Sequence, residues 1–296
     1  MPLDGGDPFF YNQGRKGERE ETPMIRYGCQ TYPWKMNERR YAGDLPHIAR
    51  VTAEAGFAGL EAEIGMLGDY FDSPDRTKEI LDENGLVLAA LVLHQDWAGP
   101  EETEEERVLS DKAIAFLDCF PRAKLMVSHH ALPGDRSVDP ELLTIRRNHL
   151  MNCMASVANR AAERGIVTAF HPNSSVNSLF RVRADYDVLF PMLERTAVGF
   201  IPDVGHIANG GMDPLGILKE SRSLIRHVHF KDRLGPNAWA VMGEGTIDYP
   251  AIVRYLEETG YGGWIIVEDE SSEAAADSDG VVLRDGTYMK QFRREA

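Results

Sequence analysis

Short apolar runs alternate with amphipathic stretches throughout residues 25–268, and this alternation predicts the fold. The apolar runs are nearly continuous, which is typical of parallel strands that are covered on both faces. Eight runs predict strands over residues 25–30, 59–63, 86–93, 124–128, 166–170, 198–203, 224–230 and 263–268.

The stretches between these runs have helical periodicity and recognisable ends. They predict helices over 44–55, 74–84, 101–119, 140–164, 184–193, 214–220 and 249–259. Asp44 and Asp248 are typical N-cap residues, and Gly85 and Gly165 are suited to end the helices before them. Repeated strand–helix units predict an α/β fold, a single (β/α)₈ TIM barrel. A doubly wound open sheet is the alternative, but no GxGxxG motif follows the first strand.

The length of 296 residues suits one barrel of about 250 residues with extensions. No linker rich in Pro, Gly or Ser interrupts the repeated units, so we predict one catalytic domain over residues 24–296. Residues 1–23 are polar and lack the apolar core of a signal peptide. We expect them to form a tail, or an arm that becomes ordered against another subunit of a homo-oligomer or a partner.

Composition restricts the partners and the compartment. A net charge of −15 argues against nucleic acid, which binds clustered Lys and Arg residues. No apolar run approaches about 18 residues, so no membrane span is expected. Cys29, Cys119 and Cys153 form no CxxC pair, which indicates buried thiols in a reducing compartment. We therefore expect a cytoplasmic protein that acts on a small molecule.

Seven of the nine histidines fall where predicted strands end: His94, His129, His130, His171, His206, His227 and His229. The active site of such a barrel lies at the carboxyl ends of the strands, and every second side chain points inward. This alternation places His171, Asp203, His229 and Glu268 at one level on the last four strands. Two imidazoles and two carboxylates suit Mn²⁺, Co²⁺, Zn²⁺ or Mg²⁺, with open positions for substrate oxygens.

Other polar residues at the same end are candidates for contact with the substrate. His206, three residues after Asp203, is suited to exchange a proton or orient a hydroxyl. Rim positions predict substrate contacts for Glu61, His94 and His129, with His130 beside them. Lys231 and Arg233 could hold an anionic or enolate oxygen; the alternative is a salt bridge with Asp232. His227 is expected deeper, in the core. Trp34, Trp97 and Trp239 fall in predicted loops and suit the apolar face of a sugar ring.

These residues resemble the xylose-isomerase-like TIM-barrel superfamily over about residues 25–270. The motifs that carry the resemblance are GFAGLE (56–61), DVGH (203–206), HVHFKD (227–232), GEGTID (243–248) and GGWIIVE (262–268). The superfamily includes ketose 3-epimerases, hydroxypyruvate isomerase, inosose dehydratase and endonuclease IV. It implies four metal ligands on strands five to eight, and Asp203, His229 and Glu268 match the last three. His171 departs from the pattern, because epimerases carry a glutamate there.

The histidine at position 171, the segment 203–214 and the tail after Glu268 resemble the inosose dehydratase branch. This resemblance implies that a metal, with Mn²⁺ the first choice, binds a keto-sugar or keto-cyclitol and stabilises an enolate. Glu268 or His206 would remove the α-proton, with His171 in the same catalytic set. We favour a dehydratase or lyase; an isomerase or epimerase is the alternative. A nuclease is disfavoured by the charge, and a non-catalytic sugar binder would show no turnover.

Overall fold

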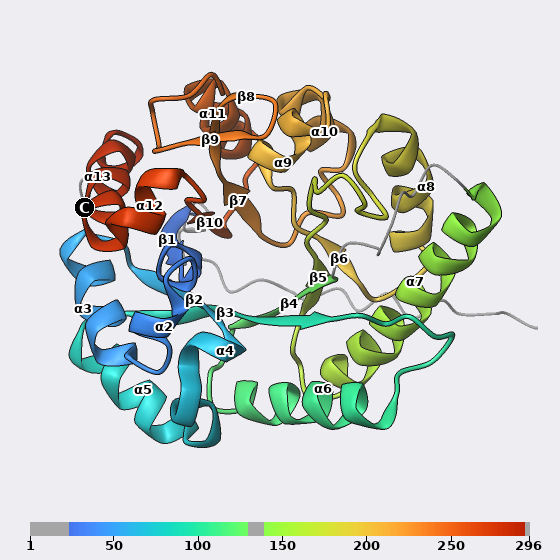
Figure 1. Ribbon diagram of the computed structural model, residues 1–296, viewed down its shortest axis with the longest axis horizontal. Coiled ribbons are helices and arrows are strands. Elements are labelled where there is room, and N and C mark those ends of the chain that lie inside the picture. Colours follow the sequence, from blue (N-terminus) through green and yellow to red (C-terminus); the bar gives the residue numbers. More distant parts are fainter. Residues whose placement is uncertain (1–23, 130–138, 294–296) are drawn as a thin grey trace, which may run out of the picture.

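The structure is a computed structural model that describes residues 24–129 and 139–293. The predicted tail over 1–23 and His130 therefore lie outside the described residues. Eight parallel strands form the centre and helices surround them (Figure 1). The strands are β1 (Arg26–Gln30), β2 (Gly59–Glu63), β3 (Val87–Gln95), β4 (Lys124–His129), β5 (Thr168–Phe170), β6 (Gly199–Phe200), β7 (Val228–Phe230) and β10 (Trp264–Val267).

The sheet closes on itself. Its strand order is β6-β5-β4-β3-β2-β1-β10-β7, which leaves β6 and β7 as the two edges. Backbone hydrogen bonds join these edges: Phe200 N donates to Leu224 O at 2.8 Å, and His229 N donates to Pro202 O at 2.9 Å. The predicted (β/α)₈ barrel is therefore confirmed, and the open doubly wound sheet is excluded.

The longer predicted helices are present with shifted ends. The helices are α1 (Tyr32–Lys35), α2 (Glu38–Tyr41), α3 (Leu45–Glu54), α4 (Ile64–Leu67), α5 (Pro74–Glu83), α6 (Glu104–Leu117), α7 (Pro140–Ala162), α8 (Arg183–Leu193), α9 (Val204–Asn209), α10 (Pro214–Glu220), α11 (Tyr249–Glu258), α12 (Ser272–Ala276) and α13 (Ser278–Met289), with 3₁₀ turns η1 (Gly68–Asp72) and η2 (Lys290–Phe292). Asp44 and Asp248 cap α3 and α11 as expected. None of the helices described is long and apolar enough to cross a membrane.

Some elements differ from the expectation for local reasons. Helix α6 begins at Glu104 rather than near 101, because Thr103 and Glu106 form a capping box that fixes its start. An antiparallel hairpin, β8 (Asp232–Gly235) and β9 (Ala238–Ala240), follows β7 before the next helix. Helices α1, α2 and α4 have only four residues each, which is too short for a periodic signal.

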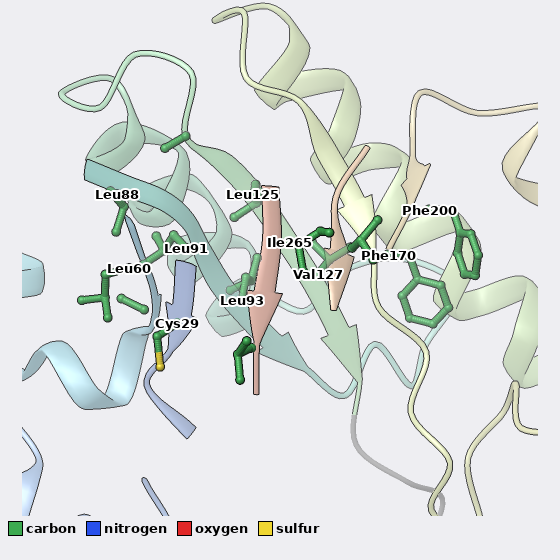
Figure 2. Close-up of a cluster of buried hydrophobic side chains, with 14 of the residues drawn as sticks. Cys29, Leu60, Leu88, Leu91, Leu93, Leu125, Val127, Phe170, Phe200 and Ile265 are labelled. Atoms are coloured by element: carbon green, nitrogen blue, oxygen red, sulfur yellow. The ribbon is translucent and has the colours of Figure 1, made fainter. Parts of the chain in front are cut away.

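Alternation along the strands produces two apolar layers. Outward-pointing residues such as Leu91, Leu93 and Phe170 pack in the large core between strands and helices, part of which Figure 2 shows. Inward-pointing residues form a smaller cluster inside the barrel: Ala90, Val92, Met126, Ala169 and Ile201. The next inward positions toward the carboxyl ends are polar, so the functional residues lie directly above a packed floor.

The lower part of the barrel interior depends on a close approach between Gly59 and Trp264. A Cβ atom on Gly59 would lie 2.5 Å from Cη2 of the Trp264 ring. That ring is almost fully buried, and the Arg26 guanidinium lies 4.4 Å from its centroid. The ring therefore has little room to move aside.

We predict that Gly59→Ala lowers the free energy of unfolding by about 1–3 kcal/mol, because the added methyl group overpacks the barrel interior. Urea titration followed by circular dichroism measures this change. Gly235→Ala is the matched control, since a Cβ there would meet no atom within 4 Å. Equal stability of the two variants would show that the interior tolerates the methyl group.

Candidate metal centre and substrate cavity

Four strand ends bring together the predicted ligands His171, Asp203, His229 and Glu268. All four side chains are buried, and each offers one ligand atom within 4.8 Å of the others. His171 Nε2 lies 3.4 Å from Asp203 Oδ2 and 3.7 Å from Glu268 Oε2. His229 Nδ1 lies 2.8 Å from the same Glu268 oxygen. The group predicted from strand alternation is therefore one compact cluster.

Three atoms of this cluster lack hydrogen bonds. Within the described part of the chain, His171 Nε2, Asp203 Oδ2 and His229 Nε2 are buried without a hydrogen-bond partner, although His229 Nε2 lies 3.0 Å from Glu61 Oε1. Leaving such atoms unsatisfied costs free energy. The other Asp203 oxygen accepts a hydrogen bond from His206 N at 2.7 Å, which fixes the carboxylate as the N-cap of α9. Orphaned nitrogen and oxygen atoms that converge in this way fit a divalent cation.

Glu61 lies behind the cluster rather than at the rim. It is fully buried, and its carboxylate contacts His227 Nε2 at 2.8 Å and His229 Nε2 at 3.0 Å. Glu61 therefore lies below the cavity, and Glu63, two residues further along β2, lines the cavity in its place. Glu61, His227 and His229 also form a second group whose ligand atoms could hold a metal ion.

The contacts of His229 divide its two nitrogens between two carboxylates. Nε2 faces Glu61 and Nδ1 faces Glu268. A carboxylate behind a metal-binding imidazole fixes the orientation of the ring and raises its basicity. Glu61 is placed for this role, with His227 holding its other oxygen.

Charge compensation controls the protonation of these groups. Burial raises the pKa of Glu61, but the two imidazoles lower it to about 2. Burial lowers the pKa of His229, but Glu61 and Glu268 raise it to about 10. Burial dominates for His227 and lowers its pKa to about 4. The His229 ring is therefore protonated on both nitrogens, and a bound cation would displace the proton on Nδ1.

Lys231 is fully buried beside the cluster. Its Nζ lies 2.9 Å from Glu268 Oε1, 2.5 Å from Glu270 Oε1 and 3.0 Å from His206 Nε2. Burial lowers the pKa of Lys231, but the surrounding carboxylates raise it well above the usual value. The ammonium group can only donate, so His206 Nε2 accepts its hydrogen bond.

The same contact determines the tautomer of His206. Since Nε2 accepts from Lys231, Nδ1 carries the proton and donates to Ser174 Oγ at 2.9 Å. Burial and the Lys231 ammonium group lower the pKa of His206 to about 3, so its ring is neutral. The Trp239 ring packs edge-on against it, with centroids 5.2 Å apart.

A cavity of about 570 Å³ lies above the cluster. His171, His206 and Glu268 line one side of it, and the predicted contact residues His94 and His129 also line it. Further polar lining comes from Gln30, Tyr32, Ser128, Asn173 and Ser175. This volume is in the range of sites for small molecules, and the many hydroxyl, amide and imidazole groups suit a polar ligand.

Three other predicted residues lie elsewhere. Arg233 belongs to β8, where its guanidinium group binds the Ala208 and Gly235 carbonyls and lines a separate cavity. The hairpin breaks the strand alternation after Lys231, so Arg233 does not line the cavity above the cluster as the sequence predicted. Trp34 and Trp97 are fully buried, so neither offers a face to a sugar ring.

Sequence reasoning missed three charged residues of the cavity. Glu270 lies two residues after Glu268, and Glu63 two residues after Glu61, so the period of two could have found both. Lys35 also lines the cavity, but it lies on the four-residue helix α1, for which the sequence gives no signal.

A sequence model of the family described as "Xylose isomerase-like TIM barrel" matches residues 49–286. The chain therefore belongs to this family. Among curated proteins it is similar to an inosose dehydratase of Lacticaseibacillus casei, with 27% identity over 291 residues, covering 90% of this chain and 96% of that protein.

Solved structures have the same architecture. The IOLI protein, in a structure with a bound zinc atom, aligns with a TM-score of 0.73 and 13% identity over 90% of this chain and 97% of that one. The 3-keto-D-glucoside 4-epimerase YcjR from E. coli aligns with a TM-score of 0.71 and 20% identity over 91% of this chain and 100% of that one. At identities of 13% and 20%, these two alignments show that the fold is shared and no more than that.

We predict that Glu61→Gln weakens Mn²⁺ binding by about 10- to 100-fold, because the amide no longer holds His229 in its ligand orientation. Isothermal titration of the metal-free protein measures this affinity. Glu63→Gln is the matched control: it makes the same chemical change two residues along β2, at a side chain that contacts Lys35 instead of His229. Equal affinities for Glu61→Gln and wild type would show that Glu61 does not support metal binding.

Proposed function

We propose that the protein is a divalent-metal-dependent enzyme that removes the proton next to the carbonyl group of a keto-sugar or keto-cyclitol, and that the reaction is a dehydration. The observation that carries this proposal is the cluster of orphaned ligand atoms on the floor of a polar cavity. The similarity to inosose dehydratases over 90% of the chain supports the choice of substrate class and reaction.

His171, Asp203, His229 and Glu268 would hold the ion. When bound, a divalent metal supplies Lewis acidity, which stabilises negative charge on a carbonyl oxygen. Two imidazoles and two carboxylates suit Mn²⁺, Co²⁺, Zn²⁺ and Mg²⁺. Mn²⁺ is our first choice among these ions. The zinc atom bound in the IOLI structure supports a divalent ion as the cofactor.

Glu268 is suited to take the α-proton, and it lines the cavity. It is held from two sides, by Lys231 at Oε1 and by His229 at Oε2. His206, the other predicted base, also lines the cavity, but its Nε2 accepts a hydrogen bond from Lys231 and its Nδ1 carries the proton, so neither nitrogen is free to remove a proton. His206 is therefore better suited to orient a substrate hydroxyl group. Lys231 fixes both side chains and keeps the carboxylates charge-compensated.

The position of His171 favours dehydration over epimerisation. An epimerase that works through two opposed carboxylates needs a second carboxylate to return the proton, and this chain has an imidazole at that ligand position. Departure of a β-hydroxyl group needs no such return. An isomerase or epimerase remains the second candidate, because Glu270 offers an additional carboxylate on the cavity wall.

The product distinguishes these outcomes. With a keto-inositol and Mn²⁺ in D₂O, we predict loss of one water molecule and formation of an α,β-unsaturated ketone, observed by NMR. An intact sugar or cyclitol that carries solvent deuterium would instead identify an isomerase or epimerase. Full activity after chelation of the metal would contradict metal dependence altogether.

Removing either of two ligands should abolish this turnover. We predict that Glu268→Gln and His229→Ala each lower kcat by at least about 10²- to 10⁴-fold, because proton transfer and substrate orientation fail together. His229→Ala should also lower the bound metal, measured by elemental analysis. Glu54→Gln is the control, since this exposed residue pairs with Arg50 on the outside of the barrel. Wild-type rates in the two ligand variants would exclude the cluster as the catalytic site.

A further inference from the structure

We propose that Lys35 and Glu63 form a second substrate subsite, which binds two neighbouring hydroxyl groups on the side of the ring remote from the metal cluster. This subsite would determine which polyhydroxylated substrate the enzyme accepts. The inference rests on the proposed function for the identity of the substrate, but its geometry is independent of the chemical step.

The barrel topology places Glu63 across the cavity from Asp203, while Lys35 follows β1, which pairs with the strand that precedes Glu268. In the closed eight-stranded order, β2 lies four strands from β6 in either direction, so the two strands are opposite. Glu63 is the last residue of β2, and Asp203 follows β6. Lys35 ends helix α1, directly after β1. Both Lys35 and Glu63 line the cavity that His171 and Glu268 also line, so a ring held at the cluster faces this pair.

The pair is fixed but remains accessible. Lys35 Nζ and Glu63 Oε2 form an ion pair, with side-chain exposures of 37% and 11%. The Glu63 backbone N–H donates to Thr31 Oγ1 at 3.0 Å, which ties the end of β2 to the start of α1. The carboxylate is therefore held at the wall, while the ammonium group reaches toward solvent and the cavity.

The chemistry of the pair indicates the kind of ligand group. A carboxylate only accepts hydrogen bonds, and an ammonium group only donates them. Side by side, they match a vicinal diol, in which one hydroxyl donates to Glu63 and the neighbouring oxygen accepts from Lys35. A phosphate or carboxylate substituent would meet the negative charge of Glu63 beside Lys35. The wall therefore favours neutral hydroxyl groups over anionic ones.

The two partners of the ion pair differ in their weight for the stability of the fold. Glu63 is buried, so Lys35→Met leaves a buried carboxylate without its partner and lowers stability. Glu63→Gln removes the charge and keeps the shape, so it should leave the barrel intact. A hydrogen bond from substrate to a charged group strengthens binding by about 10- to 100-fold. An effect of Glu63→Gln on substrate discrimination without an effect on stability would therefore report the subsite directly.

The test compares a keto-inositol with its mono-deoxy analogues that lack one hydroxyl remote from the carbonyl group. Wild-type protein loaded with Mn²⁺ should prefer the full keto-inositol over at least one analogue by about 10- to 100-fold in kcat/KM. Lys35→Met and Glu63→Gln should each lose most of this preference, through a higher KM for the keto-inositol and an unchanged rate on that analogue. The double variant should add little to either single change, because the two groups bind one diol.

Lys78→Met is the matched control, because Lys78 forms an exposed ion pair with Asp82 on the outer surface of α5. It should keep the wild-type preference. Unchanged preference in Lys35→Met and Glu63→Gln would overturn the subsite, as would an equal loss on all substrates accompanied by lower stability. Titration calorimetry with the keto-inositol separates the two proposals: weaker binding by the variants without turnover by the wild type would contradict the dehydration and support the subsite.

Discussion

Burying several charges together costs free energy unless each is compensated, and this constraint organises the carboxyl end of the barrel. Glu61, Asp203, Glu268 and Glu270 bring negative charge below or beside the cavity, and Lys231 and His229 compensate most of it. Lys231 alone contacts three of the carboxylates. The Nε2 of His171 and the Oδ2 of Asp203 are still buried without a hydrogen-bond partner. A divalent cation at this point would satisfy both atoms.

The closed sheet makes this concentration of charge possible. Every second side chain of a strand points inward, and the active site of a barrel lies at the carboxyl ends of its strands. Four successive strand ends therefore deliver four ligands to one place. The apolar cluster inside the barrel, which includes Ala90, Met126 and Ile201, packs below the polar groups and holds them in place. The opposite wall, built by α1 and the end of β2, contributes none of the four ligands. In our proposals this wall contacts the substrate hydroxyl groups, while the cluster holds the metal ion.

Nearly continuous apolar runs predicted the eight strands from sequence. Strand alternation then predicted the four clustered residues, since a period of two can be recognised in only a few residues. It failed where the backbone leaves the strand. Arg233 was expected beside Lys231, but the hairpin turns it outward. Glu61 was expected at the rim, but Glu63, the last residue of the predicted strand, is the one that lines the cavity. Lys35 reaches the cavity from a single turn of helix, and the burial of Trp34 and Trp97 depends on packing by distant elements such as α13, whose Asp279 binds the Trp34 indole.

Anomalous X-ray scattering from crystals of the Mn²⁺-loaded protein would locate the ion directly. One peak within bonding distance of His171 Nε2, Asp203 Oδ2, His229 Nδ1 and a Glu268 oxygen is the expected result. A peak among Glu61, His227 and His229 instead, or the absence of any peak at the cluster under saturating metal, would contradict the assignment of these four residues as a metal centre.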